Sequence, residues 1–187
     1  MNETLTLVDA CEDRHFADMS LIHALGWRTT YQDAVPADYM AAEITDTRWI
    51  PFFREDYESG RCHGLLLYRG DVPVTCGTYG PARVGPSPRQ SSLITFDSRG
   101  YEGWGEIISF YTHPDEKGRG YGSQLMEEML RRLRRDGFSQ AFVLVLRENA
   151  GARRFYERHG FRWDGTHEDI PFPHGTICVD LRYTRTL

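Results

Sequence analysis

The chain has 187 residues, of which 40% are hydrophobic and 26% charged, and its formal net charge is −5. This length supports one globular domain with its own core, and the negative charge argues against a general nucleic-acid surface. No apolar run approaches the ~20 residues that span a bilayer, so a membrane protein is not expected.

The N-terminal residues lack the basic and apolar segments of a secretion signal, which predicts a cytoplasmic protein. The four cysteines include no C-x-x-C pair, and the seven histidines lack the spacing of metal ligands. We therefore expect free thiols in a reducing compartment and no metal site.

The first segments read as a strand followed by two helices. Alternating leucines and threonines predict a strand over residues 4–9. Apolar side chains at three- and four-residue steps predict a helix over residues 13–28; they are Phe16, Met19, Ile22, His23 and Gly26. A second helix is expected over residues 37–59, kinked or restarted at Pro51, and its apolar side consists of Trp49, Phe52, Phe53 and Tyr57.

The next segments read as a hairpin and a long loop. Two apolar runs over residues 64–68 and 73–79 flank a turn at Gly70 and predict a β-hairpin. Glycines, prolines, serines and arginines dominate residues 80–103, which predicts a loop with room for a short strand over 92–96. Loops of this length in a compact domain are often functional or mobile.

The stretch from Glu106 to Gly122 carries the densest pattern in the chain. Branched and aromatic residues predict a strand, and His113-Pro114 ends it because proline offers no amide hydrogen to a ladder. Three glycines follow at alternate positions, and a predicted helix begins directly after them: Gly118, Gly120 and Gly122.

A strand, a glycine-rich turn and a helix N-terminus together favour an anion site. Glycine lets the backbone approach a ligand and adopt positive φ, and the free N–H groups of the first helical turn attract negative charge. Lys117 and Arg119 add cationic side chains. The alternative is a turn that needs glycine only for its geometry. Neither a Walker A loop nor a G-x-G-x-x-G dinucleotide fingerprint is present.

The last third alternates helices and strands. A helix is predicted over residues 120–136, with a buried stripe formed by Tyr121, Leu125, Met126, Met129, Leu130 and Leu133. An apolar strand follows over 138–146, and a helix over 150–159. Strands over 161–165 and 176–183 enclose a loop of histidine, acidic residues, proline and glycine.

Two motifs resemble the GNAT superfamily of acyl-CoA-dependent N-acetyltransferases. The first is K-G-R-G-Y-G at 117–122, similar to the family's Gln/Arg-x-x-Gly-x-Gly/Ala after a strand that often ends in Val-x-Pro. The second is N-A-G-A-R-R-F-Y-E-R-H-G-F at 149–161, similar to the family's Asn, Ala-rich helix and Phe-Tyr-Glu-x-x-Gly-Phe. Two positions depart from the pattern. Lys117 stands where the family has Gln or Arg and is still a cation, and Thr112 stands where Val is usual and is still β-branched. The resemblance is sharp over 106–161 and vague toward the N-terminus.

The resemblance implies an α/β fold with a mixed, splayed central sheet of six or seven strands and about four helices. It implies one domain over residues 1–187, with an acetyl-CoA-binding core over 104–161 and acceptor-side segments over 10–60 and 80–103. The last two strands would form an antiparallel hairpin at the sheet edge, and the loop between them would border the acceptor site.

The resemblance also implies acetyl-CoA as the co-substrate. Backbone groups of Phe110 and Thr112, around Tyr111, would bind the pantetheine arm. Asn149 would hydrogen-bond the pantetheine or its sulfur end, although by itself it reads as a helix N-cap. Backbone N–H groups of the turn and its two cationic side chains would bind the pyrophosphate. The residues of this site would be Lys117, Gly118, Arg119, Gly120, Tyr121, Gly122 and Ser123.

Two residues match catalytic positions of the family. Tyr156 matches the general acid that protonates the departing CoA thiolate, and a phenol with a pKa of about 10 is protonated at neutral pH; the alternative is a packed core tyrosine. Glu106 matches the strand glutamate that serves as the base in histone-type members, and period-two alternation puts it on the strand face of Phe110. Other members of the family carry the base as a glutamate on the next strand, where this chain has Leu144. The alternative for Glu106 is a solvated carboxylate, and the proton can also pass to water.

The acceptor side is less specific. Trp27 and Tyr31 resemble part of the family's acceptor wall, and packing under the sheet is an equal alternative. The expected reaction is acetyl transfer to a primary amine of a small molecule by direct attack, with no covalent enzyme intermediate. A protein or peptide acceptor and a non-catalytic acyl-CoA sensor are the alternatives. Dimers are common in the family, but no sequence feature demands one.

Overall fold

The computed structural model describes residues 4–83 and 100–187. Among these residues the strands are β1 (Leu5–Asp9), β2 (His63–Arg69), β3 (Val72–Pro81), β4 (Gly105–Thr112), β5 (Gln140–Leu146), β6 (Arg162–Pro171) and β7 (Ile177–Thr186). The α-helices are α1 (Asp13–Thr30), α2 (Ala37–Glu43), α3 (Ile50–Ser59), α4 (Tyr121–Arg135) and α5 (Ala150–Arg158).

One mixed sheet organises these elements. The strand order is β1-β2-β3-β4-β5-β7-β6; β4 and β5 are parallel neighbours, and the other neighbours run antiparallel. The predicted α/β fold with a mixed sheet of six or seven strands is therefore confirmed. The last two strands form the expected edge hairpin, with β7 on the inside against β5 and β6 outermost.

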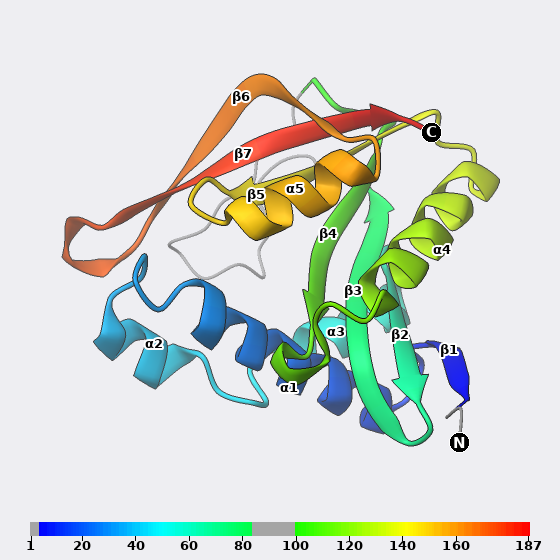
Figure 1. The fold of residues 1–187 in the computed structure, drawn as a ribbon, viewed down its shortest axis with the longest axis horizontal. Helices are drawn as coiled ribbons and strands as arrows, with labels where there is room; N and C mark the ends of the chain where they lie inside the picture. Colours follow the sequence, from blue (N-terminus) through cyan, green and yellow to red (C-terminus); the bar gives the residue numbers. More distant parts are fainter. Residues whose placement is uncertain (1–3, 84–99) are drawn as a thin grey trace.

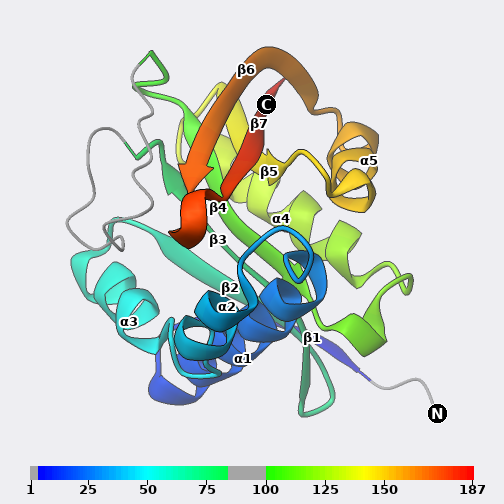
Figure 2. The same ribbon diagram turned by 90° about the vertical axis from the view of Figure 1, so that its left-hand side faces the viewer.

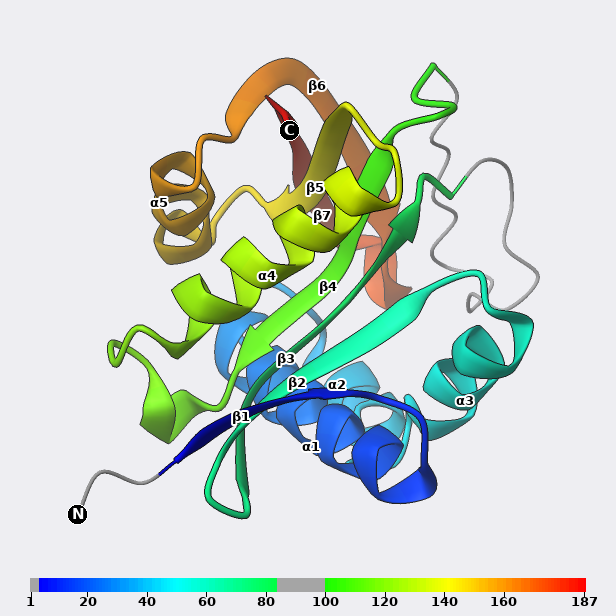
Figure 3. The ribbon, with the colours of Figure 1, turned by 90° about the vertical axis from the view of Figure 1, so that its right-hand side faces the viewer.

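Helices cover both faces of the sheet. Figures 2 and 3 show α4 and α5 on one face and α1, α2 and α3 on the other. Five of the six residues of the predicted stripe of α4 are buried in the core on its face, together with side chains of β5 and β7, whereas Tyr121 at the start of the helix is only partly buried. The predicted apolar positions of α1 are also buried, and Phe16, Met19 and Ile22 pack with residues of β2 and β3. None of the helices in the described residues is long and apolar enough to cross a membrane.

Strands β4 and β5 separate after a short paired stretch. Their ladder joins Gly105–Ile107 to Ala141–Val143. In Figure 1, β2, β3 and β4 stand nearly upright, whereas β7 crosses above them almost horizontally. A β-bulge also interrupts β4: Thr78 pairs with Ser109 and Tyr79 with Ile107, so Ile108 is the extra residue. The sheet is splayed as the family resemblance implies.

Two predicted elements differ from the structure. The helix expected over residues 37–59 is two helices, because α2 ends at Glu43 and α3 begins at Ile50, with Pro51 in its first turn, where no amide hydrogen is needed. Tyr57 is 51% exposed rather than part of the apolar side. The strand predicted to end at 165 continues to Pro171, because pairing with β7 satisfies the backbone of a polar segment. The proposed strand over 92–96 lies outside the described residues.

Candidate active site

The glycine-rich turn joins the end of β4 to the start of α4. A short 3-10 turn, Pro114–Glu116, follows the strand, and α4 begins at Tyr121. Gly118 and Gly120 have φ of 80° and 84°, a region that costs other residues about 1–2 kcal/mol. Glycine is therefore needed where the chain turns directly before a helix N-terminus, and the free N–H groups of that terminus favour an anion.

The space around the turn fits a phosphate group. A Cβ added at Gly118 or Gly120 would meet no atom within 4 Å, so both positions are open. A Cβ at Gly122 would lie 3.4 Å from Thr112 Oγ1 and 3.5 Å from the Phe110 ring. The turn thus combines an open side with a close approach of α4 to β4, and the residues present fit a bound pyrophosphate.

The two cations of the turn have different surroundings. The Arg119 side chain lies 3.5 Å from Glu116, a buried carboxylate that also forms a 2.9 Å ion pair with Arg69. Lys117 is exposed and forms no ion pair within residues 4–83 and 100–187. Lys117 is therefore the cation of this pair that is free for a phosphate, while Glu116 anchors the turn.

One edge of β4 lacks a strand partner beyond Ile107. The other edge pairs with β3 as far as Thr112, but the ladder to β5 ends at Ile107. Backbone groups on the β5 side of Phe110 and Thr112 therefore have no strand neighbour among the described residues. An extended amide chain such as pantetheine can hydrogen-bond to such an edge in the manner of an added strand.

A cavity of about 560 Å³ lies where β4 and β5 part, within the usual size of small-molecule sites. Strand β4, the residue before α5 and α5 itself form one side of it, through Phe110, Asn149 and Tyr156. Helices α1 and α3 form a second, largely aromatic side, through His23, Trp27, Tyr31, Trp49, Phe52 and Phe53. The edge hairpin closes it through Ile170, Phe172, Cys178 and Asp180.

A family model described as the Acetyltransferase (GNAT) family matches residues 7–161. The chain belongs to the GNAT family. A relative in Bacillus subtilis (strain 168), the uncharacterized N-acetyltransferase YuaI, is 26% identical over 132 residues. This match covers 71% of the present chain and 66% of the relative, so the chain spans about two thirds of that protein.

Solved structures share the GNAT-type fold. The PaiA N-acetyltransferase of Thermoplasma acidophilum, in complex with coenzyme A, has a TM-score of 0.70 at 12% identity, over 98% of this chain and 99% of that chain. The yncA structure of Salmonella typhimurium, with its cofactor acetyl-CoA, has a TM-score of 0.67 at 16% identity, over 98% and 94% of the two chains. Both fit the mixed seven-stranded sheet described above.

In this GNAT-family chain, Asn149 and Tyr156 line the cavity from the same helix, as their spacing predicts. The Asn149 carbonyl oxygen accepts a 3.0 Å hydrogen bond from the Ala152 amide, so Asn149 is the N-cap and its side-chain NH₂ remains available. Tyr156 is 6% exposed, and burial raises the pKa of its hydroxyl above the ordinary value. That hydroxyl forms no hydrogen bond with the described residues.

Glu106 lies in an ion pair rather than at the cavity wall. It is 1% exposed, and its carboxylate accepts hydrogen bonds from the Arg83 guanidinium at 2.5–3.1 Å and from the Arg83 backbone at 3.0 Å. The predicted strand face is also wrong. Ile107 and Phe110 pack in the same cluster, because the bulge at Ile108 reverses the alternation, so Glu106 lies on the opposite face from Phe110. Its role as a base is not tested by this geometry and stays a prediction.

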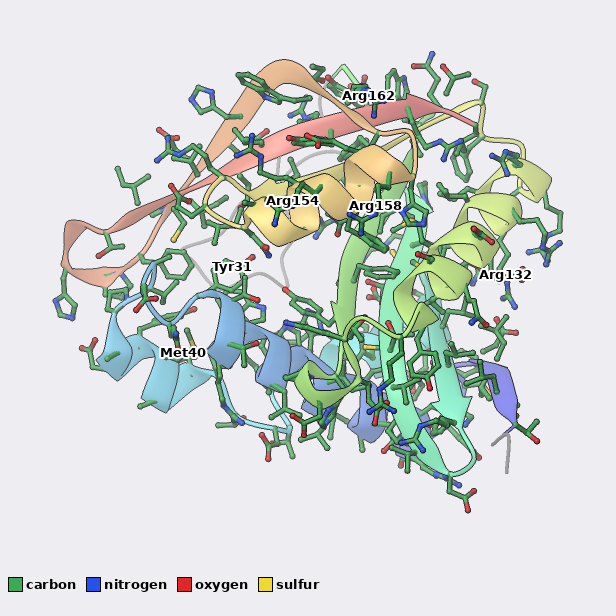
Figure 4. The ribbon with its side chains drawn as sticks, viewed as in Figure 1. Tyr31, Met40, Arg132, Arg154, Arg158 and Arg162 are labelled. Atoms are coloured by element: carbon green, nitrogen blue, oxygen red, sulfur yellow. The ribbon has the colours of Figure 1, made fainter. Side chains whose placement is uncertain are left out.

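Trp27 and Tyr31 both line the cavity and pack in the core. Their rings stack at 4.4 Å, and Trp27 also contacts the rings of Trp49 and Phe172. The hydroxyls of Tyr31 and Tyr111 interact with each other, and burial raises the pKa of both phenols. Figure 4 shows Tyr31 between the end of α1 and α5. A role in the acceptor wall and a role in packing under the sheet are therefore compatible for these two residues.

Two cavity residues were not predicted as site residues. His23 was expected only as an apolar helix position, yet its ring lies 4.4 Å from that of Trp49 and 4.2 Å from that of Tyr111. Burial lowers its pKa to about 3, so the imidazole is neutral. Asp180 lies inside the last strand, and burial raises its pKa to about 7. A single acid within the apolar run I-C-V-D-L was the available signal.

All four cysteines are free thiols, and three of them are buried. Within residues 4–83 and 100–187, no group of three or more histidine, cysteine and carboxylate side chains could hold a metal ion.

Proposed function

We propose that this protein transfers the acetyl group of acetyl-CoA to a primary amine of a small molecule. One observation carries the proposal: the cavity at the β4–β5 splay is lined on one side by Tyr156 and Asn149 and on another by the aromatic side chains of α1 and α3. A donor entering along β4 and an acceptor entering between the helices would meet in this one cavity. Holding two reactants together in this way supplies much of the rate.

The donor side is assigned from the turn and the strand edge. Bound acetyl-CoA supplies an electrophilic thioester carbonyl and a thiol leaving group. Gly118 and Gly120 open the backbone for the pyrophosphate, with Lys117 as the accompanying cation, and the unpaired edge around Phe110 and Thr112 holds the pantetheine arm. The Asn149 NH₂ group orients the end of that arm next to Tyr156.

Tyr156 acts as the general acid in this proposal. Its raised pKa keeps the phenol protonated throughout the neutral range, and its hydroxyl is free to donate to the sulfur as the carbon–sulfur bond breaks. Tyr31 and Tyr111 also line the cavity, but Tyr156 is the tyrosine that matches the general acid of the family. No covalent enzyme intermediate is involved, so the thiols have no catalytic part.

The acceptor is proposed to be small because the cavity has a volume of about 560 Å³ and is aromatic on its acceptor side. Trp27, Trp49 and Tyr31 offer apolar ring faces, which suit an amine with an apolar body. Glu106 remains a predicted base that would act through water, because Arg83 occupies its carboxylate. The free thiols agree with the proposed cytoplasmic location.

The test is CoA release from acetyl-CoA with 2-phenylethylamine, butylamine, an amino acid ester and a short peptide as acceptors. We expect turnover with the small amines. Tyr156→Phe should lower kcat about 10²–10⁴-fold while the Kd for acetyl-CoA stays unchanged.

Tyr57→Phe, at an exposed tyrosine of α3, is the matched control and should behave as wild type. Turnover with the peptide and with none of the small amines would show that the acceptor is a peptide rather than a small molecule. Tight acetyl-CoA binding without turnover of any amine would favour the sensor alternative and reject the proposed reaction.

A further inference from the structure

Asp180 occupies a position on the cavity wall that the family match, which ends at residue 161, does not reach. In the sheet it lies between Leu146 of β5 and Glu168 of β6. Leu146 and Cys178 belong to the cluster packed under α1 and α2, whereas Leu181 belongs to the cluster under α4 and α5. Asp180 therefore points toward the acceptor side of the sheet, and it lines the cavity together with Cys178.

We propose that the Asp180 carboxylate binds the ammonium group of the acceptor and accepts its proton, so that the acceptor is a primary amine that enters as a cation. This inference rests on the proposed function and adds to it the proton acceptor and the charge of the substrate. Three observations support it: the carboxylate has no ion-pair partner among residues 4–83 and 100–187, the ionisable groups that interact with it are neutral or acidic, and two other candidate bases, His23 and Glu106, are too weak or occupied.

The first observation concerns charge. No arginine, lysine or histidine of residues 4–83 and 100–187 forms an ion pair with Asp180, although its side chain is partly buried and lines the cavity. A buried carboxylate without a partner is costly, and a bound ammonium group would remove that cost. Burial, with Glu148 and Glu168 nearby, raises the pKa of Asp180 from 3.8 to about 7. A base with a pKa near the working pH is well matched to proton transfer.

The second observation concerns the surroundings of the carboxylate. Arg182, two residues further along β7, is held at 2.7 Å by Glu168 and stacks at 4.1 Å on the Tyr101 ring, so it is already engaged. The remaining titratable groups that interact with Asp180 are neutral phenols, a neutral thiol and carboxylates: Tyr31 from α1, Tyr111 from β4, Tyr156 from α5, Cys178 from β7, Glu168 from β6 and Glu148 before α5. Four other charged residues also line the cavity, Arg48, Asp56, Arg61 and Arg83, but within residues 4–83 and 100–187 Asp180 is the carboxylate that interacts with the proposed acid.

The third observation concerns the other candidates. His23 also lines the cavity, but it lies against three aromatic rings and its pKa is lowered to about 3, so it holds a proton poorly. Glu106 accepts four hydrogen bonds from Arg83 and does not line the cavity. Asp180 is the carboxylate that combines access to the cavity with proximity to Tyr156.

The proton balance of the step is complete with these two side chains. Asp180 takes one proton from the ammonium nitrogen, and the neutral nitrogen forms a bond to the acetyl carbon while the carbon–sulfur bond breaks. Tyr156 gives its proton to the sulfur and regains one from the nitrogen. Asp180 then releases its proton to water. Two protons leave the nitrogen, one ends on the thiol and one in solution.

The test compares two acceptors of nearly the same shape. 2-Phenylethylamine is a cation at neutral pH, whereas the nitrogen of O-benzylhydroxylamine is neutral. Asp180→Asn should lower kcat/KM about 10²–10⁴-fold for the first and less than about tenfold for the second, because a neutral nitrogen needs no proton acceptor. Asp169→Asn, at an exposed position of β6, is the control and should match wild type with both.

A second readout needs neither turnover nor acetyl-CoA. Difference infrared titration of the full chain against Asp180→Asn should show one carboxylate with a midpoint near pH 7. A midpoint near the ordinary value of about 4, or equal losses on both acceptors, would overturn the assignment of Asp180 alone. If wild type acetylates no amine while the infrared midpoint is near neutral, the proposed function fails, and the proton-accepting role fails with it.

Discussion

Glu106 and Arg83 form an enclosed ion pair at the point where β3 ends, next to the splay. The carboxylate is 1% exposed and all four of its hydrogen bonds come from one arginine. A buried ion pair is weak evidence for net stabilisation, but removing one of its charges is costly because the other charge stays buried. At the scale of the residue, this geometry favours a structural role for Glu106.

Glu106→Gln should therefore lower the free energy of unfolding, by up to about 3–5 kcal/mol, because the Arg83 guanidinium loses the charge of the carboxylate that accepts its hydrogen bonds. Urea unfolding at neutral pH measures this change. Glu127→Gln, at an exposed position of α4, is the control and should change stability little. A Glu106→Gln variant that unfolds like wild type but turns over slowly would instead support the predicted role as a base.

At the scale of the element, the turn between β4 and α4 determines how the helix N-terminus meets a ligand. The strand ends at Thr112, the 3-10 turn follows, and the two left-handed glycines set the direction of α4. Helix α4 is fixed in turn by its buried stripe and by an ion pair between Arg132 and Asp9 of β1. The N–H groups of the turn are therefore held on a rigid support, which suits binding of a flexible anion.

Gly120→Ala should weaken acetyl-CoA binding about tenfold, because a methyl group at φ of 84° costs about 1–2 kcal/mol and shifts the backbone N–H groups. Isothermal titration calorimetry measures the affinity. Gly70→Ala is the matched control: its φ is 59°, it also has no atom within 4 Å of an added Cβ, and it lies in the β2–β3 turn. Both variants should lose similar stability, and only Gly120→Ala should lose affinity. Equal affinities would show that the turn does not bind the ligand.

At the scale of the whole molecule, the sheet separates one hydrophobic core on one face from two on the other, and a cavity lies at the splay. One core packs under α4 and α5, and the others lie under α1, α2 and α3. Strands β4 and β5 share only three residue pairs, so the sheet gives up ladder hydrogen bonds to create the space. The Asp180 carboxylate in that space has no ion-pair partner within residues 4–83 and 100–187, which is a further cost to the fold with a measurable pH dependence.

The raised pKa of Asp180 determines the direction in which the stability of the fold changes with pH. The folded chain holds this proton up to about pH 7, whereas the unfolded chain loses it near 3.8, so this contribution to stability falls as the pH rises between those values and stays low above them. Asp180→Asn should therefore be more stable than wild type at about pH 8, by about 1–3 kcal/mol, and similar to it at about pH 4. Thermal and urea unfolding at both pH values test this. If the variant is less stable than wild type at the higher pH, the Asp180 carboxylate has a stabilising partner and the prediction is wrong.

The sequence by itself determined most of the elements and predicted the donor side, because those signals are local. The three glycines, the N-cap Asn149 and the stripe of α4 act within a few residues of chain, so their spacing predicted the turn, the helices and the position of Tyr156. Only the tertiary structure decided the acceptor side, where the contacts join distant segments. The bulge at Ile108 turns Glu106 away from the predicted face and toward Arg83. The splay brings Asp180, from the last strand, into one cavity with residues of α1 and α5, and no local pattern records that meeting.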